Sequence, residues 1–328
     1  MEERLMPVLA GGEALLEVLF SGICRTDLSI YQGDYQVPLP RVLGHEFCGK
    51  VVEVGPGVEE GYRGRIAVCE INDTCVSRQN IPLCPLCSCG LTHHCLKRSI
   101  MGILEWDGAF SQLLQVPALN LHFLPDNLSP QEAVFVEPLA AAIQTFELAE
   151  LNQGDVVAVL GVGRLGVLIC KVASLAGAQV IAISHSYEKL SQAKSYGAYQ
   201  TILASQKDLN SRLRELTNGR GADLVVESTG SPQGLNIALE LVRPQGTVAL
   251  KSTPGLPAKV DSTKAVIKEV RLQGSRCGPF PKAIALLAEE HVDVNPLITR
   301  IYPLSELEVA LREAARVGKI LLDHSVPF

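Results

Sequence analysis

Cys24 and the tripeptide Gly44-His45-Glu46 supply a thiolate, an imidazole and a carboxylate from two neighbouring parts of the chain. These are ligands that zinc takes when it does chemistry, provided that one further position stays open. Downstream, a glycine-rich turn with the sequence GVGRLG occupies residues 161–166. In this order, the two features indicate a zinc ion that can polarise an alcohol oxygen and a nicotinamide dinucleotide that can accept a hydride.

The third protein ligand is left open between two glutamates. Glu46 is adjacent to His45, so both side chains can reach a metal from one turn. Glu137 lies where the N-terminal region gives way to the dinucleotide segment. Taken singly, Cys24 is better explained as a buried apolar residue, His45 as a core histidine and Glu46 as a solvated or ion-paired carboxylate. Their joint occurrence ahead of a dinucleotide motif favours the metal site.

The glycine turn has the surroundings that a dinucleotide site requires. A buried strand is predicted over 155–160, a helix over 164–176 and a second strand over 179–184. The three glycines then permit the tight turn, the approach of the pyrophosphate and the close packing of helix on strand. Candidate cofactor-binding residues are Gly161, Val162, Gly163, Arg164, Leu165, Gly166, Ser184, His185, Ser186, Lys189 and Thr229.

The end of the second strand bears on the choice between NAD and NADP. Sites that prefer NAD usually place a carboxylate there for the ribose hydroxyls. This chain has Ser184-His185-Ser186, followed by Lys189. Because no acidic side chain would repel a 2′-phosphate, the sequence favours NADP, with NAD or dual use as the alternative.

These elements belong to two regions that differ in their pattern of predicted strands and helices. Short strands are predicted over 13–23, 47–71 and 108–124. After Pro130, helices and strands alternate, with further strands over 222–227 and 247–251, which predicts a parallel sheet covered on both faces. From about Gly278 we expect a helix, a strand, a helix and a last strand over 319–322.

Composition excludes several classes of function. The chain has 29 basic and 35 acidic residues, a net charge of -6 and no basic run, which argues against nucleic acid as the main partner. Arg164 and Lys171 interrupt the apolar stretch 156–183, so that stretch fits a strand, turn and helix better than a membrane span. The start, Met-Glu-Glu-Arg-Leu, lacks an apolar signal core, and we therefore expect a cytoplasmic protein.

The motifs resemble the zinc-dependent medium-chain dehydrogenase/reductase family, which includes alcohol, sorbitol and threonine dehydrogenases. The resemblance covers essentially the whole chain and implies an α/β fold: a GroES-like, β-rich catalytic domain over 1–138 and 278–328, and a Rossmann domain with a doubly wound parallel sheet over 139–277. Glu137 stands where many alcohol dehydrogenases carry cysteine, which favours the polyol and threonine branch. The segments that carry the resemblance are GICRTD at 22–27, PRVLGHE at 40–46, EPL at 137–139, the glycine turn, and the tail from Ile301 to Leu322.

The family also implies roles for other residues. Thr26 resembles a hydroxyl that relays the substrate proton, while the histidine that many relatives carry three residues further on is Ser29 here. Six of the ten cysteines fall between Cys69 and Cys95, and the spacing of three matches the family's structural zinc lobe, here expected over 72–100. Ile81 occupies the usual place of the first ligand. The expected ligands are Cys84, Cys87 and Cys95 with Cys75 favoured as the fourth, Cys89 as its rival, and His93 or His94 as alternatives.

The function expected from these features is hydride transfer between an alcohol or polyol, or its carbonyl form, and NAD(P), with zinc as a second cofactor. A zinc-free quinone or enone reductase and a nucleotide-binding protein without turnover are the alternatives. A homodimer or homotetramer is expected, formed through edge strands near 247–251 and 271–275. Relatives usually have a hairpin ahead of the strand that leads to Cys24, so an upstream start is an open possibility and an uncovered sheet edge is expected here.

Overall fold

The computed structural model describes residues 5–204, 208–253 and 257–326. The acidic start Met1-Glu2-Glu3-Arg4 lies outside the described residues. The chain divides into two compact units, one made of Met1–Glu137 with Phe280–Phe328 and the other of Pro138–Pro279. No described helix combines the length and the apolar character needed to cross a membrane.

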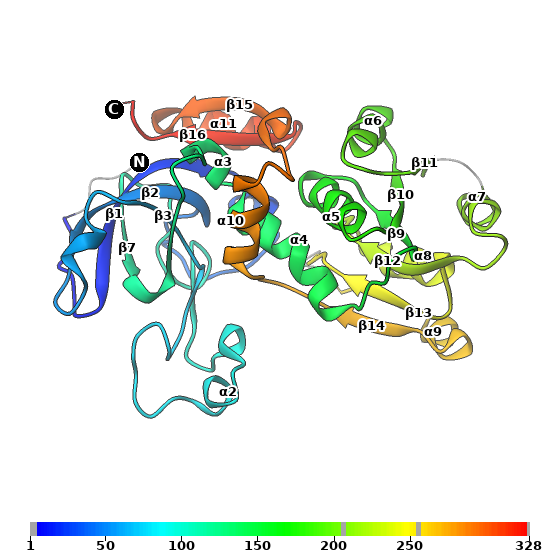
Figure 1. The fold of residues 1–328 in the computed structure, drawn as a ribbon, viewed down its shortest axis with the longest axis horizontal. Helices are drawn as coiled ribbons and strands as arrows, with labels where there is room; N and C mark the ends of the chain where they lie inside the picture. The colour runs from blue at the N-terminus through cyan, green and yellow to red at the C-terminus, as the bar shows by residue number, and fades with distance from the viewer. Residues whose placement is uncertain (1–4, 205–207, 254–256, 327–328) are drawn as a thin grey trace. The chain divides into compact units, whose positions relative to one another are not determined.

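The first unit is built on a seven-stranded sheet with the order β15-β16-β1-β2-β3-β8, to which β7 adds by pairing with β1. Its C-terminal strands lie beside its N-terminal strand although almost 300 residues of sequence separate them (Figure 1). The strands are β1 (Glu13–Gly22), β2 (Glu46–Val54), β3 (Ile66–Cys69), β7 (Leu113–Pro117), β8 (Leu121–Phe123), β15 (Ile298–Pro303) and β16 (Lys319–Asp323).

The expectation of an uncovered edge at the first strand is wrong. One side of β1 pairs with β2 along nearly its whole length. On the other side, residues 13–17 pair with β7 and residues 20–22 pair with β16. The backbone groups of β1 are therefore satisfied by two short strands from later in the chain.

Short helices and a small satellite sheet complete this unit. The helices are α1 (Arg25–Gln32), α3 (Pro130–Ala133), α10 (Phe280–Ala288) and α11 (Leu307–Ala314), and α2 (Pro85–Ser88) lies in the cysteine-rich lobe. The strands β4 (Asn72–Asp73), β5 (Ser99–Met101) and β6 (Glu105–Trp106) form a three-stranded sheet. Single-turn 3-10 helices are η1 (Glu60–Tyr62), η2 (Thr92–His94), η3 (Ala118–Asn120), η4 (Asn295–Leu297) and η5 (Leu304–Glu306).

The second unit is a six-stranded parallel sheet with the order β11-β10-β9-β12-β13-β14 and helices packed on it. The predicted α/β class is confirmed. The strands are β9 (Val156–Leu160), β10 (Gln179–Ser184), β11 (Gln200–Leu203), β12 (Ala222–Glu227), β13 (Val242–Leu250) and β14 (Arg271–Gly274). The helices are α4 (Val136–Leu148, which begins at the unit boundary), α5 (Arg164–Leu175), α6 (Tyr187–Ser195), α7 (Leu209–Leu216), α8 (Gly234–Leu241) and α9 (Ser262–Lys268).

Sequence patterns failed where polar residues or turn formers interrupt an element. The strand predicted over 247–251 begins at Val242, because Pro244, Gln245 and Gly246 look like a turn but lie within β13. Gln245 adopts a φ of 56°, and Gly246 packs so closely that a Cβ would lie 2.6 Å from Val242. We also missed α7 and α9, whose exposed polar faces hide their helical spacing.

A buried histidine at the end of β16 predicts a loss of stability in acid. His324 Nδ1 donates to the carbonyl of Ser111 at 3.0 Å, so Nε2 accepts from the hydroxyl of Ser21 at 2.8 Å. Burial lowers the pKa of His324 to about 4. His324 therefore takes up a proton near pH 6.5 in the unfolded chain but only near pH 4 in the folded chain. Because the unfolded chain binds the extra proton, the free energy of unfolding falls by about 3 kcal/mol as the pH falls from 6.5 to 4.

Urea unfolding at a series of pH values between 4 and 7 measures this effect. We expect His324→Gln to remove most of the pH slope in that interval, whereas His291→Gln leaves the slope unchanged because His291 is exposed. Equal slopes for wild type and His324→Gln would contradict the prediction.

Candidate active site and metal centres

The first turn of α1 places Cys24 and ties it to the segment that carries His45. Cys24 caps the helix in an extended conformation directly after β1. The buried carboxylate of Asp27 accepts hydrogen bonds from the backbone N–H of Cys24 at 2.8 Å and of Gly44 at 3.1 Å. Gly44 has a φ of 96°, and a Cβ there would lie 2.5 Å from the ring of Phe110, so only glycine fits.

Cys24, His45 and Glu46 converge in this unit. One ligand atom from each lies within 4.8 Å of the other two, and both His45 and Glu46 are buried. Sulfur, imidazole nitrogen and carboxylate oxygen form a donor set suited to zinc, and three protein ligands leave a fourth position for another molecule. The residues present therefore fit a catalytic metal.

Charge at the cluster also suits a cation. Burial alone would raise the pKa of the Cys24 thiol, but the facing His45 outweighs it and the pKa lies below its ordinary value. Burial would lower the pKa of His45, but Asp27 and then Cys24 raise it well above its usual range. His45 Nδ1 lies 3.3 Å from Asp27 Oδ1, the kind of contact that orients a metal-binding imidazole.

The structure adds Lys319, which the sequence had not singled out. Lys319 is the first residue of β16, is buried, and forms an ion pair with Glu46. Burial lowers the pKa of its ammonium group to about 8, although the charges of Cys24 and Asp27 oppose this. The sequence pointed to Lys319 only through a lysine at the start of the apolar strand KILLD. It pointed to Asp27 only through an acidic residue three positions after a helix cap.

Two other predicted site residues, Thr26 and Glu137, lie in the first turns of α1 and α4. Thr26 is half-buried in the first turn of α1, with its hydroxyl 3.8 Å from the sulfur of Cys24. Glu137 is half-buried in the first turn of α4. Within the described part of the chain, Glu137 is not among the residues whose ligand atoms converge.

Four cysteines gather in the lobe that carries α2. Cys75, Cys84, Cys87 and Cys95 are all buried and offer sulfur atoms within 4.8 Å of one another. The sulfur of Cys95 lies 3.5 Å from that of Cys75 and 3.8 Å from that of Cys84. Four thiolates around one zinc ion at 2.3 Å stand about 3.8 Å apart, so this spacing fits a closed structural site.

Of the alternatives for the fourth ligand, none joins this cluster. Cys89 is exposed at the end of α2. His93 lies 3.7 Å from the carboxylate of Glu70, and His94 is exposed. Burial of Cys75 beside Cys95, with its N–H directed to that sulfur at 3.4 Å, separates it from Cys89.

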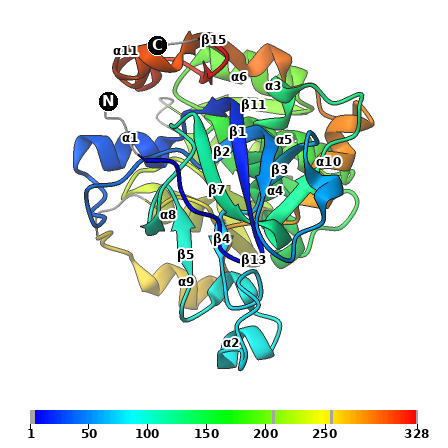
Figure 2. The same cartoon turned by 90° about the vertical axis from the view of Figure 1, so that its left-hand side faces the viewer.

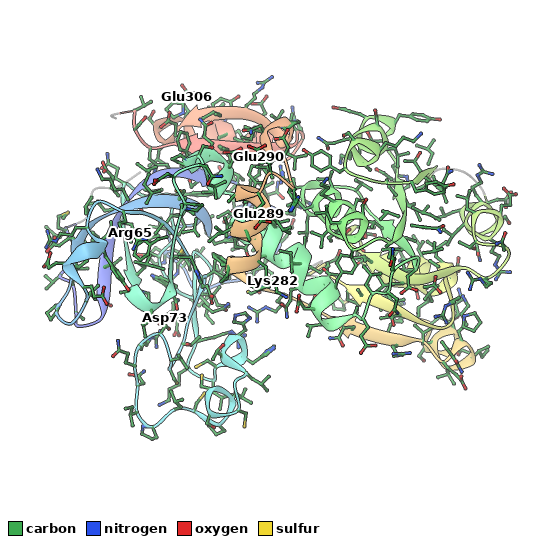
Figure 3. The ribbon with its side chains drawn as sticks, viewed as in Figure 1. Arg65, Asp73, Lys282, Glu289, Glu290 and Glu306 are labelled. Atoms are coloured by element: carbon green, nitrogen blue, oxygen red, sulfur yellow. The ribbon has the colours of Figure 1, made fainter. Side chains whose placement is uncertain are left out.

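Polar contacts tie the two ends of the lobe to each other at its base. Figure 2 shows β4 and β5 leading into the lobe, and Figure 3 labels Asp73 at its base. Asp73 accepts from Arg78 Nε at 2.6 Å and from the hydroxyl of Ser77 at 2.8 Å. Arg78 also donates to the carbonyl of Lys97 at 3.2 Å, so both ends of the lobe share one guanidinium.

The glycine turn of the second unit has the geometry of a phosphate cradle. Gly161 has a φ of 96°, and a Cβ there would lie 2.9 Å from the backbone of Ser228. A Cβ on Gly166 would lie 2.1 Å from the carbonyl oxygen of Gly161, so helix and strand pack in contact. A Cβ on Gly163 would meet nothing within 4 Å, which leaves open space at the start of α5 for a pyrophosphate. The turn fits a dinucleotide.

The other cofactor candidates surround the carboxyl ends of β10 and β12. Ser184 is buried, and the hydroxyl of Ser186 accepts from the N–H of Lys189 at 3.3 Å, which caps α6. The side chains of His185 and Lys189 are exposed. Thr229, also exposed, donates its hydroxyl to the buried carboxylate of Glu227.

Known proteins resemble the chain along nearly its whole length. Residues 10–126 match the alcohol dehydrogenase GroES-like domain, and residues 164–289 match the zinc-binding dehydrogenase family. A sorbitol dehydrogenase of Halalkalibacterium halodurans is 30% identical over 98% of this chain and 94% of its own. An L-threonine 3-dehydrogenase of Bacillus licheniformis is 32% identical over 97% of this chain and 93% of its own. Among solved structures, the alcohol dehydrogenase TADH from Thermus sp. ATN1 superposes with a TM-score of 0.87 at 31% identity, covering 98% and 95% of the two chains.

The chain therefore belongs to the zinc-type medium-chain dehydrogenase family. It is a zinc-dependent oxidoreductase that transfers hydride between the CH–OH group of a small-molecule alcohol and NAD(P). The alternatives of a zinc-free quinone reductase and of a protein without turnover are not what these relatives support.

Proposed function

We propose that Cys24, His45 and Glu46 hold the catalytic zinc of an alcohol or polyol dehydrogenase. The observation that carries this proposal is the convergence of the three ligand atoms within 4.8 Å, in the unit that matches the GroES-like family. Glu137 is the alternative carboxylate ligand. Zinc content of Glu46→Gln and Glu137→Gln distinguishes the two, because loss of the true ligand weakens retention of one zinc equivalent per chain.

When bound, zinc supplies a Lewis acid that stabilises negative charge on the alcohol oxygen, and NAD(P) accepts the hydride. The protein's part is to position groups and to manage protons. Asp27 fixes the orientation of His45, since its carboxylate lies against the imidazole. Thr26 holds the alcohol proton on its hydroxyl and passes it toward solvent. Lys319 forms an ion pair with Glu46 and offsets part of the negative charge that Cys24, Asp27 and Glu46 bring to this buried site.

We propose that Cys75, Cys84, Cys87 and Cys95 hold a second, structural zinc ion. The lobe has few apolar contacts of its own: among the described residues, Leu86 is the one partly buried apolar side chain packed against the four cysteines. Backbone N–H groups of Cys87 and Leu96 lower the pKa of Cys84 to about 6, so one sulfur is already favoured as thiolate. A closed tetrahedral site stabilises such a segment where a hydrophobic core does not.

The substrate class that we propose is a polyol or a hydroxylated amino acid. The relatives named above act on sorbitol and on L-threonine. We place the enzyme in the cytoplasm. The expectation that residues 247–251 form an edge strand is wrong, because β13 lies between β12 and β14. We propose that β14, at the end of the six-stranded sheet, joins two copies edge to edge. Its exposed Leu272 and unpaired strand edge are features that a second copy would cover.

For the dinucleotide, we propose NADP. The end of β10 and the residues after it offer two serines, a histidine and a lysine near the expected position of the ribose, and the strand itself ends on Ser184 without a carboxylate; the acidic residue of the segment, Glu188, lies in the first turn of α6. We expect Lys189→Ala to lower kcat/KM for NADP about tenfold, because a charge-assisted contact to the 2′-phosphate is lost, and to leave that for NAD nearly unchanged. Lys194→Ala, on the same helix, is the matched control. A larger loss with NAD than with NADP would refute the assignment.

One assay tests the proposed function as a whole. Zinc content and nicotinamide absorbance change are measured on the same protein over a panel of alcohols, polyols and L-threonine, with NAD and NADP side by side. We expect activity with at least one hydroxylated substrate, lost on chelation and restored by zinc. Activity that survives complete removal of zinc would overturn the proposal.

A further inference from the structure

The second unit has a concavity at the amino ends of its parallel strands, whereas the glycine turn lies at their carboxyl ends. The turn follows the carboxyl end of β9, whereas the concavity lies where β12 and β13 begin, about 20 Å away along parallel strands. Its volume is about 600 Å³. Its charged lining consists of Arg214, Arg220, Arg243, Lys268, Asp223 and Glu240.

Each of the two carboxylates of this lining is already paired with a cation, Asp223 with one inside the lining and Glu240 with one outside it. Asp223 accepts from Arg243 Nε at 2.6 Å and from the N–H of Val156 at 2.8 Å. Glu240 forms an ion pair at 2.6 Å with Lys264, which does not line the concavity. The lining has four cationic side chains and two carboxylates. Because Arg243 pairs with Asp223 and Glu240 pairs with Lys264, the lining keeps a net positive charge.

Two guanidinium groups carry most of that excess. Arg214 donates its Nε to the amide oxygen of Asn210 at 3.1 Å. Across residues 5–204, 208–253 and 257–326, neither Arg214 nor Arg220 forms an ion pair with a carboxylate. Lys268 is half-buried and donates to three backbone carbonyls at the end of α8, at 2.8 to 2.9 Å. Burial and then the charge of Arg214 lower the pKa of Lys268, and the opposing charge of Glu240 does not restore it.

The turn that presents Arg220 is held rigidly. Gly219 and Gly221, on either side of it, have φ values of 83° and 92°. The buried hydroxyl of Thr217 donates to the carbonyl of Leu213 at 2.9 Å and accepts from the N–H of Gly221 at 3.0 Å. Arg220 thus projects from a fixed backbone, so little order is lost when its side chain binds a ligand.

We propose that this concavity is a second anion-binding site, which takes a small phosphate-bearing molecule independently of the dinucleotide. Arginine forks match the oxygen geometry of phosphate and bind it through two parallel hydrogen bonds. Arg214 comes from α7 and Arg220 from the loop before β12, so they can grip one phosphate from two sides. A volume of about 600 Å³ accommodates a small metabolite.

Calorimetric titration of the full-length protein with inorganic phosphate tests this site. The titration is made at constant ionic strength and with saturating dinucleotide, so that phosphate cannot bind at the glycine turn. We expect one phosphate per chain, bound more weakly as salt rises. Arg214→Gln with Arg220→Gln is expected to weaken binding at least tenfold. Arg212→Gln is the matched control, because Arg212 lies on the same helix, pairs with Glu215 and does not line the concavity.

Wild-type protein that takes up no phosphate under these conditions would overturn the proposal, as would a double variant that binds like the wild type. Arg220→Gln alone serves as the second variant, because its exposed side chain can be changed without affecting the fold. We expect it to weaken binding by itself. Since binding of phosphate is measured directly, the result does not depend on whether the chain oxidises any particular alcohol.

Discussion

Cys24→Ser is expected to lower kcat about a thousandfold or more and to remove one of two zinc equivalents per chain. Hydroxyl oxygen is a poor replacement for a thiolate ligand, and loss of the metal's charge stabilisation costs several kcal/mol in the transition state. The thiol of Cys24 faces His45, and we expect both side chains to be needed to retain the ion. Elemental analysis of the purified variant, alongside steady-state kinetics with the best alcohol of the panel, measures both effects.

Cys48→Ser is the control for this change. Cys48 is a buried cysteine of β2 outside both clusters, and burial raises the pKa of its thiol to about 12. We expect this variant to keep two zinc equivalents and its kcat, with some loss of stability from a buried hydroxyl. If Cys24→Ser kept both zinc equivalents and the wild-type rate, the proposed metal centre would be wrong.

Cys75→Ser is expected to release the other zinc equivalent and to destabilise the protein by several kcal/mol. Three remaining sulfur atoms hold zinc poorly, and the lobe has little core with which to stay folded. For a domain of this size, such a loss corresponds to a fall in Tm of about 5 to 10 °C. Scanning calorimetry and zinc analysis on the same sample provide the measurement.

Cys89→Ser separates a ligand effect from a general effect of losing a thiol in the lobe. Cys89 is exposed and lies outside the four-cysteine cluster, so zinc content and Tm should both stay at the wild-type value. Zinc loss from Cys89→Ser, with retention by Cys75→Ser, would reverse our assignment of the fourth ligand.

Local patterns predicted the fold well because each is enforced over a few residues. The glycine turn requires a strand before it and a helix after it, and β9 and α5 lie where this rule places them. The pair Cys24 and His45 could be found because their residue types are rare together. Helices with exposed polar faces, such as α7, offered no comparable signal.

What the sequence could not provide was contact across long separations. Lys319 reaches Glu46 only because β16 pairs with β1, which in turn pairs with β2, and no local spacing encodes that pairing. For the same reason, the sequence could not decide whether Cys75 or Cys89 completes the four-cysteine cluster. Eight residues separate Cys75 from Cys84, and the chain turns back within them, with Gln79 at a φ of 55°. Sequence distance therefore misrepresented spatial distance.

Because β16 pairs with β1, the N-terminal strand obtains one of its partners late in synthesis. The first strand leaves the ribosome long before its partner, and at 5 to 20 residues per second roughly 15 to 60 seconds pass before residues 319–323 follow. During this interval Glu46 lacks the lysine that offsets its charge, and residues 20–22 of β1 lack their partner on one edge. Nascent protein is thus exposed to mispairing until residues 319–323 have emerged, and a variant that lacks these five residues would leave Gly22 and its neighbours in β1 without their partners.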